Sequence, residues 1–189
     1  MNLNVSRRDF IKSSAVGAAG MSIGLRQGLT WGADVERPNI VLINVDDLGT
    51  ECLGCYGSET YVTPNVDKLS DSGMRFEHCY ATPLCSPSRV MLMTGRYPFR
   101  TGWVDLIGRG KNPLSFLDPE KELTFGHVLK QAGYTTGVCG KWQLCELTDH
   151  PTHVEDCGFD EHCLWTWVYD KEPTSRYWNP TIIENGMLR

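Results

Sequence analysis

Three stretches of the sequence have the apolar pattern of β-strands. Residues 39–45 form a largely apolar run, which is typical of a strand buried on both faces of a parallel sheet. Residues 74–80 and residues 134–138 are shorter candidates. We therefore predict three strands, of which the first is fully buried.

Between and after these stretches, apolar residues recur at helical spacing. The pattern predicts helices within residues 63–73, 86–95 and 124–133. Each begins at a threonine or a Ser-Pro pair and ends at a glycine, which are ordinary helix boundaries. Strand, helix, strand, helix, helix, strand is the order of an α/β fold with a mainly parallel sheet and helices on both faces.

The first 33 residues have the pattern of an export signal. Arg7 and Arg8 precede Phe10 and Lys12, and a short, weakly apolar stretch follows. That stretch is too short to cross a bilayer, which takes about 20 apolar residues. We therefore predict a twin-arginine signal over residues 1–33, recognised by the twin-arginine translocon, and a periplasmic or secreted protein without a stable membrane span.

The charge of the chain argues against nucleic acid as a partner. The formal net charge is −5, although the first 33 residues carry four basic groups and one acidic group. The remainder, residues 34–189, is therefore more acidic than the total. Such a surface repels phosphate backbones, so an anionic substrate needs a local cluster of cations.

Two adjacent carboxylates follow the first predicted strand. Asp46 and Asp47 precede Leu48 and Gly49, and ligands of open α/β sheets lie beyond the carboxyl ends of strands. Two carboxylates repel each other unless a cation lies between them, and oxygen ligands suit Ca²⁺ or Mg²⁺. Asp-x-Gly sequences are also common in solvated turns, so both interpretations stay open.

A cysteine stands at the start of the second predicted helix. Cys85 precedes Ser-Pro-Ser and Arg89. A cysteine beside an apolar helix is commonly a small buried hydrophobe. A helix N-terminus, however, attracts anions and favours the thiolate, and Arg89 lies one turn further along.

A third group of candidate site residues lies around Lys141, with Gly140 before it and Gln143 after it. An exposed lysine is the ordinary interpretation. The sequence is not a P-loop, because the required glycine before Gly140 and the Ser or Thr after Lys141 are absent.

The Cys-x-Pro-Ser-Arg sequence at 85–89, followed by Leu-x-Thr-Gly-Arg at 92–96, resembles the signature of formylglycine-dependent sulfatases. Residues 39–49, 55–57 and 63–69 are similar to the opening strand, the next segment and the first helix of that family. The resemblance implies an alkaline-phosphatase-like fold, of which residues 34–189 are an incomplete, N-terminal portion of the catalytic domain.

The family resemblance also implies a chemistry. Cys85 would be oxidised to formylglycine by a formylglycine-generating or sulfatase-maturating enzyme, and its hydrate would attack the sulfur of a sulfate ester. Asp46, Asp47 and the modified Cys85 would bind Ca²⁺, or alternatively Mg²⁺. Arg89 and Lys141 would hold the sulfate group, and sulfated polysaccharides are candidate substrates. Gln143 stands where sulfatases usually have histidine, so its role in proton transfer is in question.

Two other functions remain open. The chain has no Asp-Asn dipeptide, whereas the later half of the family's domain supplies such a metal pair. A non-catalytic remnant or anion-binding module is therefore one alternative. Hydrolysis of phosphate or phosphonate esters is another, because relatives in the same superfamily perform it.

Three further features carry predictions of their own. Cys145, Cys157 and Cys163 are disulfide candidates in an exported protein. His150 and His153 are expected in a polar loop rather than as a metal-ligand pair. The aromatic residues at 165, 167, 169, 177 and 178 either line a sugar-binding rim or belong to a core.

Overall fold

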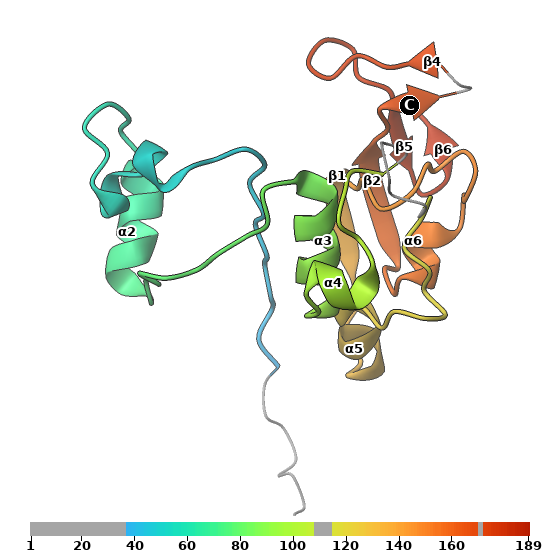
Figure 1. Cartoon of the computed structure of the whole chain (residues 1–189), viewed down its shortest axis with the longest axis horizontal. Coiled ribbons are helices and arrows are strands. Elements are labelled where there is room, and N and C mark those ends of the chain that lie inside the picture. The colour runs from blue at the N-terminus through green and yellow to red at the C-terminus, as the bar shows by residue number, and fades with distance from the viewer. Residues whose placement is uncertain (1–36, 108–114, 170–171) are drawn as a thin grey trace, which may run out of the picture. The chain divides into compact units, whose positions relative to one another are not determined.

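The computed structural model describes residues 37–107, 115–169 and 172–189 (Figure 1). The chain divides into two units, the second of which begins at Val45. All helices and strands described below lie in that second unit. The predicted export signal lies outside the described residues. No described helix has the length and apolar character needed to cross a membrane.

The predicted helices are present. Helix α2 spans Pro64–Ser72, α3 spans Cys85–Thr94 and α5 spans Phe125–Gln131. Thr124 caps α5, with its hydroxyl accepting from the His127 amide while His127 Nδ1 accepts from the Thr124 amide. Gly95 ends α3 in the left-handed conformation, as predicted. Two short helices, α4 (Pro98–Thr101) and α6 (His153–Asp156), were not predicted.

The prediction of a mainly parallel sheet is wrong, because the main sheet is mixed. Strand β1 (Gly137–Lys141) pairs in parallel with β2 (Glu161–Trp165). Strand β5 (Ile182–Glu184) is antiparallel to β2, and β6 (Met187–Leu188) is antiparallel to β5. The turn between β5 and β6 makes these two strands antiparallel. Asn185 and Gly186 in that turn both have positive φ, as a tight hairpin requires.

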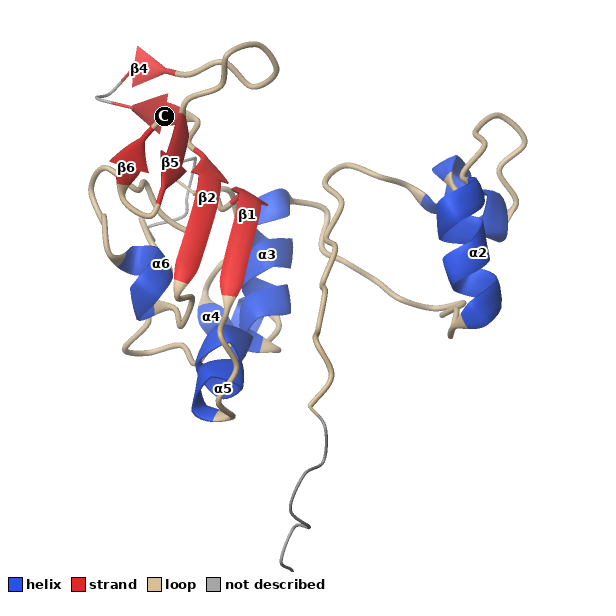
Figure 2. Cartoon of the chain, turned by 180° about the vertical axis from the view of Figure 1, so that it is seen from behind, coloured by secondary structure: helices blue, strands red, loops and turns tan. Residues whose placement is uncertain are grey.

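A second, smaller sheet consists of β3 (Val168–Tyr169) and the antiparallel β4 (Glu172–Pro173). In both ribbon views α3 lies beside β1, and α6 lies beyond β2 on the other side (Figures 1 and 2). The parallel pair β1–β2 thus has helices on either side of it.

Two of the predicted strands are absent. Residues 39–45 are not assigned to a strand, and their apolar side chains are exposed, with Val41 at 82% and Ile43 at 76%. Residues 74–80 are likewise exposed and unassigned. An apolar run becomes a buried strand only when neighbouring strands and covering helices are in place. The third predicted strand, 134–138, is present but begins at Gly137, because the Tyr134 amide still bonds to Leu129 O at the end of α5.

Two 3₁₀ helices, Thr50–Cys52 (η1) and Gly54–Tyr56 (η2), precede α2. The backbone amides of Gly54 and Cys55 donate to the side chains of Thr63 and Asp67, at 2.9 and 2.7 Å. These bonds connect the segment around Cys55 to the first turn of α2.

The hydrophobic core lies between residues 90 and 183. It consists of Val90, Trp103, Ile107, Leu117, Trp142, Leu144, Cys145, Leu147, Val154, Cys157, Phe159, Leu164 and Ile183. Val90 of α3 and Leu164 of β2 belong to this core, and Val138 of β1 packs against it, so the three elements share one hydrophobic cluster.

His153 belongs to this core, so its prediction as a polar-loop residue is wrong. It is 2% exposed. Trp142 Nε1 donates to His153 Nδ1 at 3.1 Å, and His153 Nε2 lies 2.6 Å from Leu117 O. With Nδ1 accepting, Nε2 carries the proton and donates to the carbonyl, so the ring is neutral. Burial lowers the pKa of His153, which keeps it neutral.

This buried histidine predicts acid-sensitive stability. The unfolded chain takes up a proton near the ordinary pKa of about 6.5, whereas folded His153 resists it. The stabilisation is fully present above that pH and is lost as the pH falls below it. The melting temperature should fall as the pH decreases from about 7.5 to about 5, and this decrease should be smaller in His153→Gln. The control is the exposed His78→Gln, which should follow the wild type; an equal slope in His153→Gln contradicts the prediction.

Candidate active site

Cys85 is the first residue of α3 and is half-buried. The next two residues, Ser86 and Pro87, are buried. Ser86 Oγ accepts from the Ile107 amide at 3.2 Å and donates to Gln143 O at 3.5 Å. The short side chain of Ser86 thereby joins the start of α3 to the loop after β1. Sequence reasoning gave Ser86 no such role.

Arg89 and Lys141 converge on one carboxylate. Arg89 NH2 lies 2.8 Å from Asp46 Oδ2, and Lys141 Nζ lies 3.0 Å from the same oxygen. Arg89 NH1 also donates to Lys141 O at 2.6 Å. Three of the residues predicted from sequence are thus brought together across 43 and 95 positions of the chain.

This cluster is held in a partly shielded environment. The side chains of Arg89 and Lys141 are 13% and 19% exposed, and that of Asp46 is 37% exposed. Burial by itself raises the pKa of Asp46, but the hydrogen bonds and charges of Arg89 and Lys141 outweigh it and lower the pKa below its usual range. Asp46 is therefore ionised at neutral pH and holds two cations, of which Arg89 lies one helical turn after Cys85 in α3.

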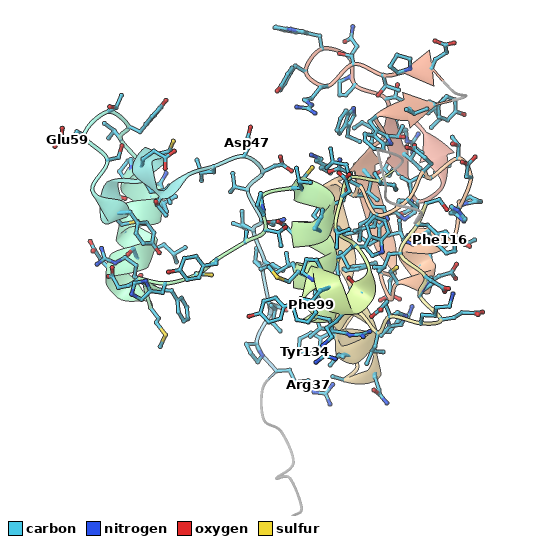
Figure 3. All side chains as sticks on the ribbon, in the orientation of Figure 1. Arg37, Asp47, Glu59, Phe99, Phe116 and Tyr134 are labelled. Carbon is cyan, nitrogen blue, oxygen red and sulfur yellow. The ribbon has the colours of Figure 1, made fainter. Side chains whose placement is uncertain are left out.

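Asp47 does not join the cluster. Its backbone has a φ of 60°, which is uncommon for a residue other than glycine. Its side chain is exposed and points outward from the loop before η1 (Figure 3). Among the described residues, no group of three or more His, Cys, Asp or Glu side chains is placed to hold a metal ion.

The donor chemistry at Asp46 and Asp47 suits a hard cation, but the number of donors does not. Ca²⁺ takes about six to eight oxygen ligands. One oxygen of Asp46 is already shared by two cationic side chains. The described residues therefore do not form a metal site by themselves.

Gln143 follows β1 in a strained conformation. Its φ is 57°, in the left-handed region, and Ser86 bonds to its carbonyl. Its Oε1 atom is buried and has no hydrogen-bond partner among the described residues. The side chain lines a small pocket together with Lys141, Trp165 and Arg176. Of these, Arg176 was missed by sequence reasoning; the signal was a lone arginine among aromatic residues.

The disulfide predictions are not realised, because all eight cysteines are free thiols. Cys145 and Cys157 are buried, and burial raises the pKa of Cys157 to about 12 and that of Cys145 further still. Cys163 is exposed and lies opposite Cys139 in the β1–β2 register. The buried thiols act as core residues and are protonated at neutral pH.

Comparison with known sequences assigns the family. The model of the sulfatase family matches residues 38–182. The chain belongs to the sulfatase family. Human arylsulfatase D is 45% identical over 136 residues, covering 68% of this chain and 23% of that protein. The N-acetylglucosamine-6-O-sulfatase of Bacteroides thetaiotaomicron is 33% identical over 154 residues, covering 81% of this chain and 24% of that protein.

Solved sulfatase-like structures agree with this assignment. The crystal structure of Ps i-CgsB matches with a TM-score of 0.61 and 38% identity, over 69% of this chain and 28% of that one. The same protein has been solved in complex with k-i-k-neocarrahexaose. This sulfatase chain thus spans about a quarter of the length of the relatives it matches.

The N-terminal prediction is confirmed as well. Residues 4–24 match the twin-arginine translocation signal. This signal indicates export of the sulfatase chain across the cytoplasmic membrane.

Proposed function

We propose that this chain carries part of the active site of a sulfuric ester hydrolase that cleaves sulfate monoesters. The observation that carries the proposal is the convergence of Arg89 and Lys141 on Asp46, with Arg89 one turn after Cys85, the first residue of the same ten-residue helix. The signal sequence supports the further proposal that the protein acts in the periplasm or outside the cell. The division into a signal over 1–33 and a catalytic portion over 34–189 is part of the same proposal.

The charge of the reaction explains these residue types. A sulfate monoester is an anion, and negative charge grows on the leaving oxygen as the S–O bond breaks. Fixed cations lower the energy of that state, and they act best where water is partly excluded. Arg89 and Lys141 would hold the sulfonyl oxygens, and the free amides of the first turn of α3 would add to the positive potential.

Cys85 would act after conversion to formylglycine, whose hydrate supplies an in-line nucleophile and can later expel sulfate as the aldehyde is regenerated. The conversion requires a formylglycine-generating or sulfatase-maturating enzyme as a partner. A buried Ser86 and Pro87 would fix the modified side chain at the helix start.

A divalent cation, Ca²⁺ or alternatively Mg²⁺, is proposed at Asp46 and Asp47, where it would supply charge for nucleophile activation. Its remaining oxygen ligands would have to come from outside the described residues.

Gln143 would orient the hydrate or the sulfate group and would not transfer protons. Its amide can donate to a hydrate or sulfate oxygen, but it has no proton to exchange near neutral pH. The hydrogen bond from Ser86 to the Gln143 carbonyl holds the backbone in place, and Gln143 lines the same pocket as Lys141.

Sulfated carbohydrates are the proposed substrate class. The relatives include an N-acetylglucosamine-6-O-sulfatase and a protein solved with k-i-k-neocarrahexaose. The exposed aromatic residues at 177 and 178 offer amphipathic surfaces beside the pocket residue Arg176.

Mass spectrometry of Cys85 tests the proposal. Trypsin should release residues 76–89 from protein made in its native host, and the peptide should have the mass expected when the Cys85 thiol is replaced by an aldehyde or its hydrate. Cys79 in the same peptide is the internal control and should keep its thiol. An unmodified Cys85 contradicts the proposal that this residue supplies the nucleophile. It favours the alternative of an anion-binding module, which the incomplete set of metal donors among the described residues also supports.

A further inference from the structure

The small pocket next to Lys141 lies at the carboxyl ends of two parallel strands. Lys141 and Trp165 are the last register pair of β1 and β2, and both line the pocket. Trp142 and Gln143 extend one wall, Thr166 and Trp167 extend the other, and Arg176 comes from the loop before β5. Ligands of α/β proteins commonly lie at this end of parallel strands.

The loop that carries Arg176 is fastened to the pocket wall. The Thr174 amide donates to Trp167 O at 2.9 Å, and the Thr174 hydroxyl donates to Thr166 O. Trp165 Nε1 donates to Ser175 O at 2.9 Å, which also fixes the indole plane. The guanidinium of Arg176 is therefore presented by a hydrogen-bonded loop.

Arg176 forms no ion pair with a carboxylate in the part of the chain that the structure describes. Its guanidinium carbon lies 5.3 Å from the centre of the Trp165 ring and 5.9 Å from that of Tyr177. A hydrogen bond with Tyr177 raises the pKa of Arg176, so the guanidinium stays charged, and Arg176 lines the same pocket as Lys141.

The pocket has the size of a substituent rather than a sugar ring. Its volume is about 30 Å³, which is room for roughly two or three water molecules. The buried Gln143 Oε1 atom has no hydrogen-bond partner within the described ranges. Tyr177 and Trp178, next to Arg176, are 78% and 84% exposed, so their rings are accessible to a ligand that reaches Arg176.

We propose that this pocket is a subsite for a polyanionic carbohydrate, in which Arg176 binds a second sulfate of the substrate while Lys141 and Arg89 hold the sulfate to be cleaved. The proposal rests on the sulfatase function proposed above. A guanidinium has five N–H donors, so Arg176 can bond to Tyr177 and still offer donors that match the oxygens of a sulfate group. Arg176 would then select multiply sulfated sugars over singly sulfated ones.

Binding of two matched probes tests this subsite. Hexasaccharides of ι- and κ-carrageenan share a backbone but carry two and one sulfates per repeat. Calorimetric titration of the full chain should give tighter binding of the ι probe. Arg176→Gln should weaken binding of the ι probe by about tenfold and remove most of the preference. The matched control is Arg100→Gln, an exposed arginine stacked 5.6 Å over Phe99 outside the pocket, which should keep the wild-type preference.

The outcomes separate this subsite from the proposed function. An unchanged ι preference in Arg176→Gln, or no ι preference in the wild type, overturns the subsite, whatever the state of Cys85. If Arg176→Gln loses the preference while Cys85 is unmodified, the subsite stands and the hydrolase proposal fails. Failure of both probes to bind overturns the subsite, and the Cys85 peptide then still decides the hydrolase proposal independently.

Discussion

Cys85→Ala is expected to reduce hydrolysis of para-nitrophenyl sulfate by about 10⁴-fold or more. Alanine keeps the helix start and the Cβ carbon but lacks the thiol that the proposed oxidation to an aldehyde requires, so the proposed nucleophile cannot form. The fold should tolerate the change, because Cys85 is only half-buried and makes no hydrogen bond through its sulfur among the described residues. Turnover of matured protein, with circular dichroism to check folding, measures the effect.

Cys139→Ala is the matched control for this substitution. Cys139 is an exposed thiol in the middle of β1 and lies outside the proposed site. Its replacement should leave turnover within about twofold, since exposed substitutions away from a site have small effects. Equal activity of the Cys85→Ala variant and the wild type is the result that removes Cys85 from the mechanism.

Lys141→Met is expected to lower turnover of the same ester by about 10²- to 10³-fold, the usual cost of removing one charge-stabilising donor. Methionine replaces the long stem of lysine, so packing in the shielded site is largely kept, while the ammonium that bonds to Asp46 is lost. Asp46 retains Arg89 as a partner, so the carboxylate is not left unpaired.

Lys121→Met provides the comparison for Lys141→Met. Lys121 also pairs with a carboxylate, Asp118 at 2.6 Å, but its side chain is 79% exposed. Its loss should leave turnover unchanged and stability nearly so, because exposed ion pairs contribute about 0–1 kcal/mol. If Lys141→Met and Lys121→Met have the same activity, the proposed role of Lys141 is wrong.

The helices were predictable because their signals are local. Thr63-Pro64, Thr124 and the glycines after each helix act within one turn, and the structure places α2, α3 and α5 between those residues. The predicted strand at 39–45 is absent from the structure. A continuous apolar run forms a buried strand only where other strands and helices cover it, and the run itself does not say whether they are present. The Asn185-Gly186 turn was a local hairpin signal that the sequence analysis did not use.

The candidate site was predicted in part, through motifs rather than contacts. Asp46, Arg89 and Lys141 were each singled out from their neighbours in the chain, but no pattern indicated that both cations bind the same oxygen. Ser86 and Arg176 had no sequence signal strong enough, since their roles depend on Gln143 O and on the Trp165 ring.

The sequence by itself determined the family, the export signal and the helix boundaries, and it singled out the residues proposed to react, because these depend on short segments whose chemistry is local. The tertiary structure alone decided the mixed sheet, the burial of His153, the pairing of Asp46 with Arg89 and Lys141, and the pocket around Arg176. These features join residues far apart in the chain, and their energies arise only once packing has brought the groups together and removed water from between them.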